Sequence, residues 1–170
     1  MPNTYTLIQA QTLTTSTASV TFSSIPATYT DLLLKVSVRT ARATTSDALS
    51  IKLNNSTSSY SSRNCLNDNG SAVSYTDLFG VGYVINTQGN STTANTFSNQ
   101  EIYIPNYAGS NYKSFSSESV VENNATDTRV EMMASLWSDG SAVTSIVIAS
   151  YTANNLLQYS TFYLYGIKNS

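Results

Sequence analysis

The sequence predicts an all-β chain of 170 residues that folds as a single antiparallel β-sandwich domain, 1–170. Three observations support this fold class. Apolar and polar residues alternate over many short segments, turn residues separate these segments at regular spacing, and no segment keeps a helical period over three turns. Alternation with a period of two is typical of strands with one buried face. Many short strands with evenly spaced turns indicate a sandwich, for which a jelly-roll-like form is common at this strand number.

The clearest strand pattern lies in Asp31–Arg39, soon after the Ile25-Pro26 turn. Proline fixes its own φ and disfavours the helical region for the residue before it, so Ile25 is expected to be extended. One face of the strand holds four aliphatic residues, Leu32, Leu34, Val36 and Val38. We therefore expect a central strand on whose aliphatic face the rest of the chain folds.

Nine further segments show a similar pattern. In chain order they are Tyr5–Ala10, Ala18–Ser23, Leu49–Leu53, Tyr60–Leu66, Phe97–Ile104, Lys113–Val121, Val130–Trp137, Ile146–Ile148 and Ser160–Ile167. Together with the central strand, this predicts about nine or ten strands.

Two segments are less regular. Residues 67–96 are predicted as an irregular, loop-rich insertion, in which Gln88–Asn95 is a loop because it is rich in Gly, Ser, Thr and Asn. Tyr75–Ile85 is expected as an irregular strand or a surface excursion, because Gly80 and Gly82 interrupt the apolar residues in this part of the insertion. Within it, Asn69-Gly70 is a strong turn signal. Residues 1–16 are expected either as an extended N-terminal arm or as a first strand that pairs with the last one.

Composition limits the partners of the chain. Charged residues make up only 11%, against about 25% in a typical soluble domain. Twelve tyrosines offer contact area and a hydroxyl, which suits contacts with protein or glycan. The net charge is −2 and the eight basic residues are scattered, which argues against nucleic acid. We also expect no membrane partner and no signal peptide, because no long apolar run or basic leader is present.

The sequence offers no catalytic or metal-binding signature. Histidine is absent, which excludes a Ser-His-Asp triad and the commonest metal ligand. The single cysteine, Cys65, is expected to be a small buried apolar group. A glycosidase would need two nearby carboxylates. Glu101 and Glu131 are the pair considered, but outward, solvated positions fit them better. We expect no enzyme activity, no cofactor and no metal.

Exposed aromatic residues are the remaining candidates for contacts. Tyr103, Tyr107 and Tyr112 flank the Pro105 turn, and Trp137 stands near Asp139. Such rings could stack on a sugar or fill a pocket of a partner. For Trp137, the alternative is that it closes one end of the core.

Four segments resemble a family of small β-rich virion proteins of tailed bacteriophages, especially phages of aquatic bacteria and cyanobacteria. They are SIPATYTDLLLKVSVRT, EIYIPNYAGSNYKSFSSESVVENNAT, LWSDGSAVTSIVI and the closing QYSTFYLYGIKNS. The resemblance covers nearly the whole chain, with Asn54–Thr96 the least matched part. It implies a non-enzymatic particle component, and it transfers no functional residues.

This resemblance leads to two functional expectations. The first is a capsid decoration (cement) protein, favoured as a homotrimer, that is made in the host cytoplasm and binds the major capsid protein on the outside of the head. Symmetric packing of many copies would stabilise the head through multivalency. The alternative is a tail-fibre or tail-tip module that binds host surface glycan.

Overall fold

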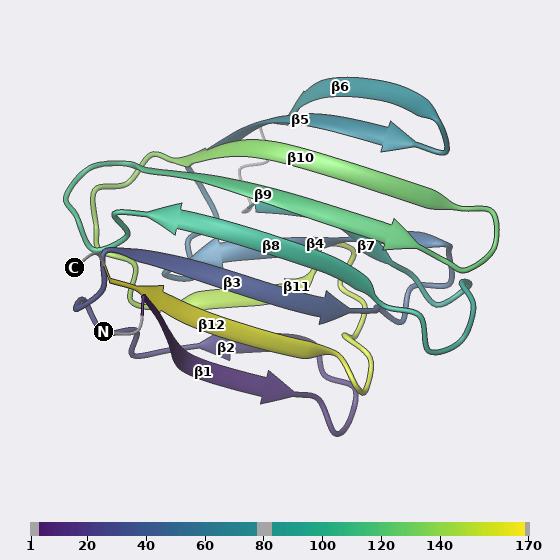
Figure 1. Ribbon diagram of the computed structural model, residues 1–170, viewed down its shortest axis with the longest axis horizontal. Helices are drawn as coiled ribbons and strands as arrows, with labels where there is room; N and C mark the ends of the chain where they lie inside the picture. Colours follow the sequence, from purple (N-terminus) through teal and green to yellow (C-terminus); the bar gives the residue numbers. More distant parts are fainter. Residues whose placement is uncertain (1–3, 78–82, 169–170) are drawn as a thin grey trace.

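The computed structural model describes residues 4–77 and 83–168. Over these residues the chain forms twelve strands and no helix (Figure 1). In chain order the strands are β1 (Tyr5–Thr12), β2 (Ser19–Phe22), β3 (Asp31–Val38), β4 (Ser46–Leu53), β5 (Tyr60–Asp68), β6 (Ser71–Asp77), β7 (Tyr83–Gln88), β8 (Ser98–Pro105), β9 (Lys113–Glu122), β10 (Thr128–Trp137), β11 (Ile146–Ser150) and β12 (Thr161–Ile167). No described helix is long and apolar enough to cross a membrane.

The strands form two sheets of unequal size. The large sheet has eight strands in the order β1-β12-β3-β8-β9-β10-β5-β6, and the small sheet has four in the order β2-β11-β4-β7. Figure 1 shows the small sheet behind the middle of the large one. The predicted antiparallel sandwich is therefore confirmed, with twelve strands rather than nine or ten.

The two additional strands, β6 and β7, come from the segment 67–96. The loop-rich interpretation therefore does not hold for 71–77 and 83–88, and the strand alternative for Tyr75–Ile85 holds where β6 and β7 enter that segment. Gly80 and Gly82 lie outside the described residues. β6 lies at the edge of the large sheet, and its residues 71–74 are all exposed. Because neither face of these residues is buried, the sequence shows no regular alternation of apolar and polar residues there. The predicted turn is correct: Asn69 and Gly70 both have positive φ and join β5 to β6.

The first strand pairs with the last. β1 runs antiparallel to β12, from the Tyr5–Ile167 pair to the Thr12–Thr161 pair. Residues 5–12 are therefore an edge strand of the sheet rather than an extended arm. Figure 1 shows the start of β1 and the end of β12 on the same side of the molecule.

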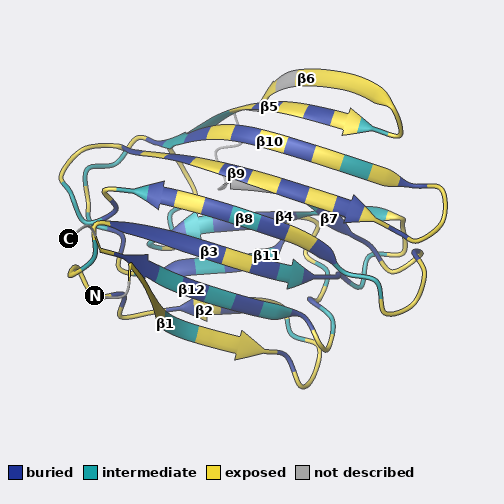
Figure 2. Ribbon diagram, in the orientation of Figure 1, coloured by how far each residue is buried: buried dark blue, intermediate teal, exposed yellow. Residues whose placement is uncertain are grey.

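The apolar core lies between the sheets around β3. All four aliphatic residues predicted for the inner face of β3 are buried, and Figure 2 shows the alternation of buried and exposed residues along the strands of the large sheet. From the small sheet, the core receives Val20, Phe22, Leu49, Ile51, Leu53, Ile85, Ile146 and Ile148. The central role predicted for Asp31–Arg39 is confirmed.

Where β7 faces the large sheet, the interior contains a polar cluster beside the apolar core. Glu131 on β10 is only 1% exposed, so its predicted position on a solvated face is wrong. Its Oε1 accepts a hydrogen bond from Asn64 Nδ2 (2.7 Å), and its Oε2 accepts two from Asn86, from the backbone N–H and from Nδ2 (both 2.9 Å). Ser119 and Gln100 donate to the Asn86 carbonyl. This polar layer ties β7 to the large sheet.

A buried arginine holds the loop between β7 and β8. The Arg39 side chain donates hydrogen bonds to the carbonyls of Asn90 (2.9 Å), Thr92 (2.9 Å) and Thr93 (2.5 Å). Desolvation by burial lowers the pKa of Arg39. The loop character predicted for Gln88–Asn95 holds from residue 89 onward, and this loop is fixed to the end of β3.

Candidate functional site

The outer face of the large sheet presents three rows of side chains that cross all eight strands in register. The central row is Ala10, Tyr163, Lys35, Glu101, Glu118, Met132, Cys65 and Ser74. The Asn99 row is Thr12, Thr161, Ser37, Asn99, Val120, Val130, Asn67 and Ala72. The Tyr103 row is Leu7, Tyr165, Leu33, Tyr103, Ser116, Ala134, Arg63 and Thr76. Tyrosine and charged side chains lie on β12, β3, β8 and β9, and a cluster of exposed apolar side chains lies on β9 and β10.

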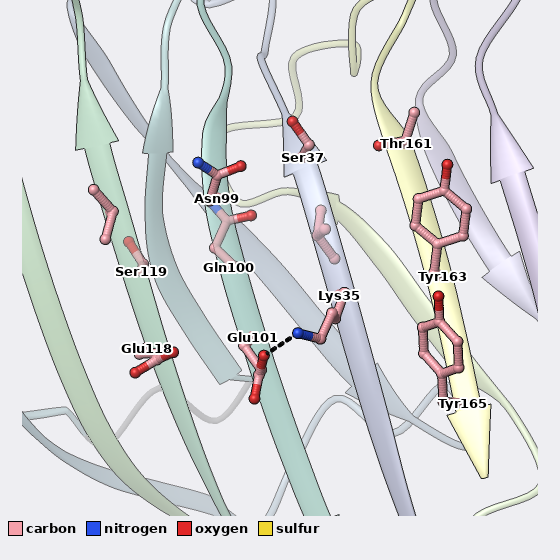
Figure 3. Close-up of a pocket in the computed structure, with 12 residues that line it drawn as sticks. Lys35, Ser37, Asn99, Gln100, Glu101, Glu118, Ser119, Thr161, Tyr163 and Tyr165 are labelled. Carbon is pink, nitrogen blue, oxygen red and sulfur yellow. Dashed lines mark ion pairs between the residues drawn. The ribbon is translucent and has the colours of Figure 1, made fainter. Parts of the chain in front are cut away.

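The polar half of this face forms a shallow, open groove of about 490 Å³ over β12, β3, β8 and β9. Figure 3 shows its main side chains coming from four neighbouring strands. We use "the groove" for the six residues Lys35, Asn99, Glu101, Glu118, Tyr163 and Tyr165. Its volume falls within the range of small-molecule sites, roughly 300–1,000 Å³.

An ion pair crosses the floor of the groove. Lys35 Nζ lies 2.7 Å from Glu101 Oε2, and this hydrogen bond is the main reason why the pKa of Lys35 is raised. The two side chains are 53% and 38% exposed, so the pair contributes at most about 1 kcal/mol to stability. Glu118 stands directly opposite Glu101 in the sheet register, where like charges disfavour the pairing. Lys35, Glu101 and Glu118 together therefore carry two carboxylates and one ammonium group.

The other half of the face carries an apolar patch. We define the patch as Val120, Val130 and Met132, which are 44%, 49% and 64% exposed. Val120 and Val130 are partners in register on β9 and β10, and Met132 follows two residues after Val130. Cys65, the register partner of Met132, is also exposed. The prediction of a buried Cys65 is therefore wrong, because the outward face of β5 is not covered.

The structure separates the four aromatic residues predicted as contacts. Tyr107 and Trp137 are 0% and 1% exposed, so the contact role expected for them is corrected. Tyr103 and Tyr112 are 37% and 62% exposed and remain available for contacts. The four residues do not form one common surface site.

Each buried aromatic residue has a structural role. Tyr107 Oη donates a hydrogen bond to the Pro26 carbonyl and accepts one from the Tyr29 N–H (3.4 Å), which fixes the turn before β3. Trp137 stacks on Tyr60, with ring centroids 6.1 Å apart. Its buried position confirms the alternative in which Trp137 closes part of the core.

Tyr103 is tied to the start of β3. Its Oη donates to Asp31 Oδ2 at 2.7 Å. This hydrogen bond, with a smaller contribution from burial, raises the pKa of Tyr103 to about 12. The phenol therefore remains neutral and acts as a hydrogen-bond donor at physiological pH.

The structure gives no support to the carboxylate pair considered for a glycosidase. Glu101 faces the groove on the outer side of the sheet, whereas Glu131 is buried between the sheets. A sheet separates the two carboxylates, so they cannot flank one glycosidic bond. Within the described residues, no group of three or more His, Cys, Asp or Glu side chains could hold a metal ion.

Sequence reasoning missed the groove itself. The alternation in Ser160–Ile167 already placed Tyr163 and Tyr165 on the face opposite Phe162 and Leu164. What it could not provide was the order of the strands. Only the order β12-β3-β8-β9 brings these tyrosines beside Lys35 and the two glutamates.

Comparisons with known proteins do not identify a family. No protein-family model matches the chain, and no curated protein matches it. Among solved structures, galectin LEC-6 from Caenorhabditis elegans has 8% identity and a TM-score of 0.30, and the match covers 98% of this chain and 96% of the galectin. CG-16, a homodimeric agglutinin from chicken liver, has 10% identity and a TM-score of 0.24, with 70% and 92% covered. Both TM-scores are too low to support an argument about fold or function.

Proposed function

We propose that this chain is a non-enzymatic virion protein of a tailed bacteriophage that decorates the outside of the head. The observation that carries this proposal is the apolar patch on the outer face of the large sheet. Large apolar side chains that cluster on a surface are typical of protein–protein contacts. The family resemblance in the sequence suggests the major capsid protein as the partner.

The proposed mechanism is adhesion. A sheet of eight hydrogen-bonded strands presents the patch on a regular surface, so little ordering is needed when it docks. Many copies on a symmetric lattice would bridge neighbouring capsid subunits and gain strength through multivalency. A homotrimer on threefold positions is the assembly that we favour.

Electron microscopy of intact virions with a gold-labelled antibody against this chain tests the proposal. Label spread over the head is the expected result. Label confined to the tail would overturn the head location and favour the tail-fibre or tail-tip alternative. Absence of label, together with absence of the protein from disrupted particles, would overturn a virion role altogether.

A further inference from the structure

We propose that the groove is a binding subsite for a neutral, hydroxyl-rich saccharide. This inference goes beyond head decoration and does not depend on it, since the groove extends from β12 to β9, whereas the patch lies on β9 and β10. Three features of the groove carry it: two adjacent tyrosine rings, fixed hydrogen-bonding groups beside them, and a local excess of negative charge.

The tyrosine rings provide an apolar platform. Tyr163 and Tyr165 follow one another on the outer face of β12, and both are half-buried. In Figure 3 the two rings are seen nearly face-on, one after the other along the strand. The C–H groups on one side of a pyranose ring form an apolar face that packs well on such rings. Their partial burial restricts ring motion, which lowers the entropy cost of binding.

Groups that bind hydroxyls lie beside the rings. Lys35 is the register partner of Tyr163, and Glu101 and Glu118 follow on the next two strands. Each carboxylate has about four lone-pair sites, so the ion pair to Lys35 leaves Glu101 able to accept further hydrogen bonds. Bonds from sugar hydroxyls to a carboxylate are charge-assisted and stronger than those between neutral groups. Asn99, in the adjacent row, adds both a donor and an acceptor.

The charge of the groove determines which saccharides fit. With Glu101, Glu118 and Lys35 the site carries a net charge of one negative unit, and Glu118 has no ion pair within the described residues. A sialic acid or uronic acid would place its carboxylate against this excess charge. Neutral hexoses donate hydroxyl hydrogens to the same oxygens without that repulsion. We therefore assign the groove to neutral sugars.

The β12 side of the groove remains accessible when the patch is docked. Neighbouring strands lie about 4.8 Å apart, so Tyr163 on β12 and Met132 on β10 are separated by four strand spacings, or roughly 19 Å. A partner that covers the patch on β9 and β10 would also reach Glu118, but it would leave the tyrosines of β12 and Lys35 of β3 open. The decorating subunit would then carry a saccharide site on its exposed margin.

Saturation-transfer NMR with the full chain tests the inference. The probes are the methyl glycosides of glucose, galactose, mannose and N-acetylglucosamine at millimolar concentration, together with methyl glucuronide and methyl sialoside. We expect saturation transfer to at least one neutral probe and weaker or no transfer to the two acidic ones. The dissociation constant of the best neutral probe is then measured by titration.

Paired variants locate the site. Tyr163→Ala and Glu118→Gln are each expected to weaken binding of that probe by about tenfold, equivalent to about 1.4 kcal/mol. The matched controls are Tyr112→Ala, an exposed tyrosine outside the groove, and Glu122→Gln, an exposed glutamate further along β9. Both controls should bind as the wild type does. All four positions are at least partly exposed, so unchanged unfolding curves are expected to confirm that each variant folds.

Three results would overturn the inference. The first is no saturation transfer to any neutral probe. The second is saturation transfer to the acidic probes that equals or exceeds transfer to the neutral ones. The third is binding of the neutral probe that is unchanged in both Tyr163→Ala and Glu118→Gln. None of these results affects where gold label falls on a virion. If the groove variants instead lose binding to heads and no variant binds sugar, the groove is a protein contact.

Discussion

At the scale of single residues, Gly166 is a position where the backbone leaves no room for a side chain. A Cβ atom there would lie 2.3 Å from the ring of Tyr29, which packs against the core beside the turn before β3. Gly166→Ala must therefore displace that ring, and overpacking of this kind costs about 1–3 kcal/mol. Urea denaturation should show this loss in the free energy of unfolding.

The double variant provides the control for this prediction. Tyr29→Ala removes the ring that the new methyl group would meet. Adding Gly166→Ala to the Tyr29→Ala variant should therefore lower the free energy of unfolding much less than it does in the wild type. Strictly additive losses would show that the ring contact is not the cause.

A second prediction for single residues concerns alkaline pH. The hydrogen bond to Asp31 raises the pKa of Tyr103 to about 12, and burial raises that of Tyr60 to about 12. The ordinary pKa of tyrosine is 10.0. Between that pH and about pH 12, these two tyrosines therefore bind more protons in the folded chain than in the unfolded chain. The stability that these two groups contribute is fully present below pH 10 and is lost as the pH rises to about 12.

Ultraviolet titration of the phenolate groups measures this effect. Tyr103→Phe should remove one of the tyrosines that ionise near pH 12, and it should reduce the fall in unfolding free energy above pH 10. The assignment fails if the variant keeps the same number of late-ionising tyrosines as the wild type.

At the scale of elements, Arg39 determines the conformation of the loop 89–97. Its guanidinium satisfies three backbone carbonyls of this loop, whereas a lysine ammonium at the same place could not match that planar arrangement of donors. Arg39→Lys is expected to lower the free energy of unfolding by about 2 kcal/mol. Hydrogen exchange should accelerate in residues 90–96 before it changes in β3. Arg63→Lys on exposed β5 is the matched control and should leave the exchange of this loop unchanged.

Glu131 has the same anchoring role for β7. Glu131→Gln replaces one acceptor oxygen by an NH2 group that would face Asn64 or Asn86 donor groups, so we expect a loss of about 1–3 kcal/mol in unfolding free energy. The matched control is Glu118→Gln on the exposed face of β9, which should change stability by less than about 0.5 kcal/mol. Equal effects at the two positions would contradict the anchoring role.

The elements also show what a sequence pattern can predict. In β3, aliphatic residues occupy one face and polar residues much of the other, so its position in the core was predictable. In β10 both faces contain apolar residues, and the structure buries the one with Glu131, Met133 and Trp137. The pattern could not reveal this choice, because it depends on Asn86 of β7 providing partners for Glu131. β7 itself lies across the end of Tyr75–Ile85, where the pattern is irregular, and the start of Gln88–Asn95, which has the composition of a loop.

At the scale of the whole molecule, the division into eight and four strands produces the candidate site. Because the small sheet lies on the inner face of the large one, it leaves the three outward rows uncovered, although Leu33 within them is only 6% exposed. Each row combines residues from all along the chain; the central row joins Ala10, Cys65 and Tyr163. Local alternation predicts which residues point outward. It contains no information on strand order, which is why Tyr163 could be predicted as outward but not as a neighbour of Lys35.

The docking role of the patch leads to the last prediction. Met132→Lys places a charge in the apolar surface proposed to contact the capsid, and docking would desolvate both this charge and Glu118, its register partner on β9. Because Met132 is 64% exposed, the substitution should change unfolding free energy by less than about 0.5 kcal/mol. Cosedimentation with heads that lack this protein should nevertheless fall at least tenfold, whereas Met132→Leu, which keeps the apolar character, should cosediment as the wild type does. If Met132→Lys binds heads normally, another surface makes the contact, because a desolvated lysine could not leave the affinity unchanged.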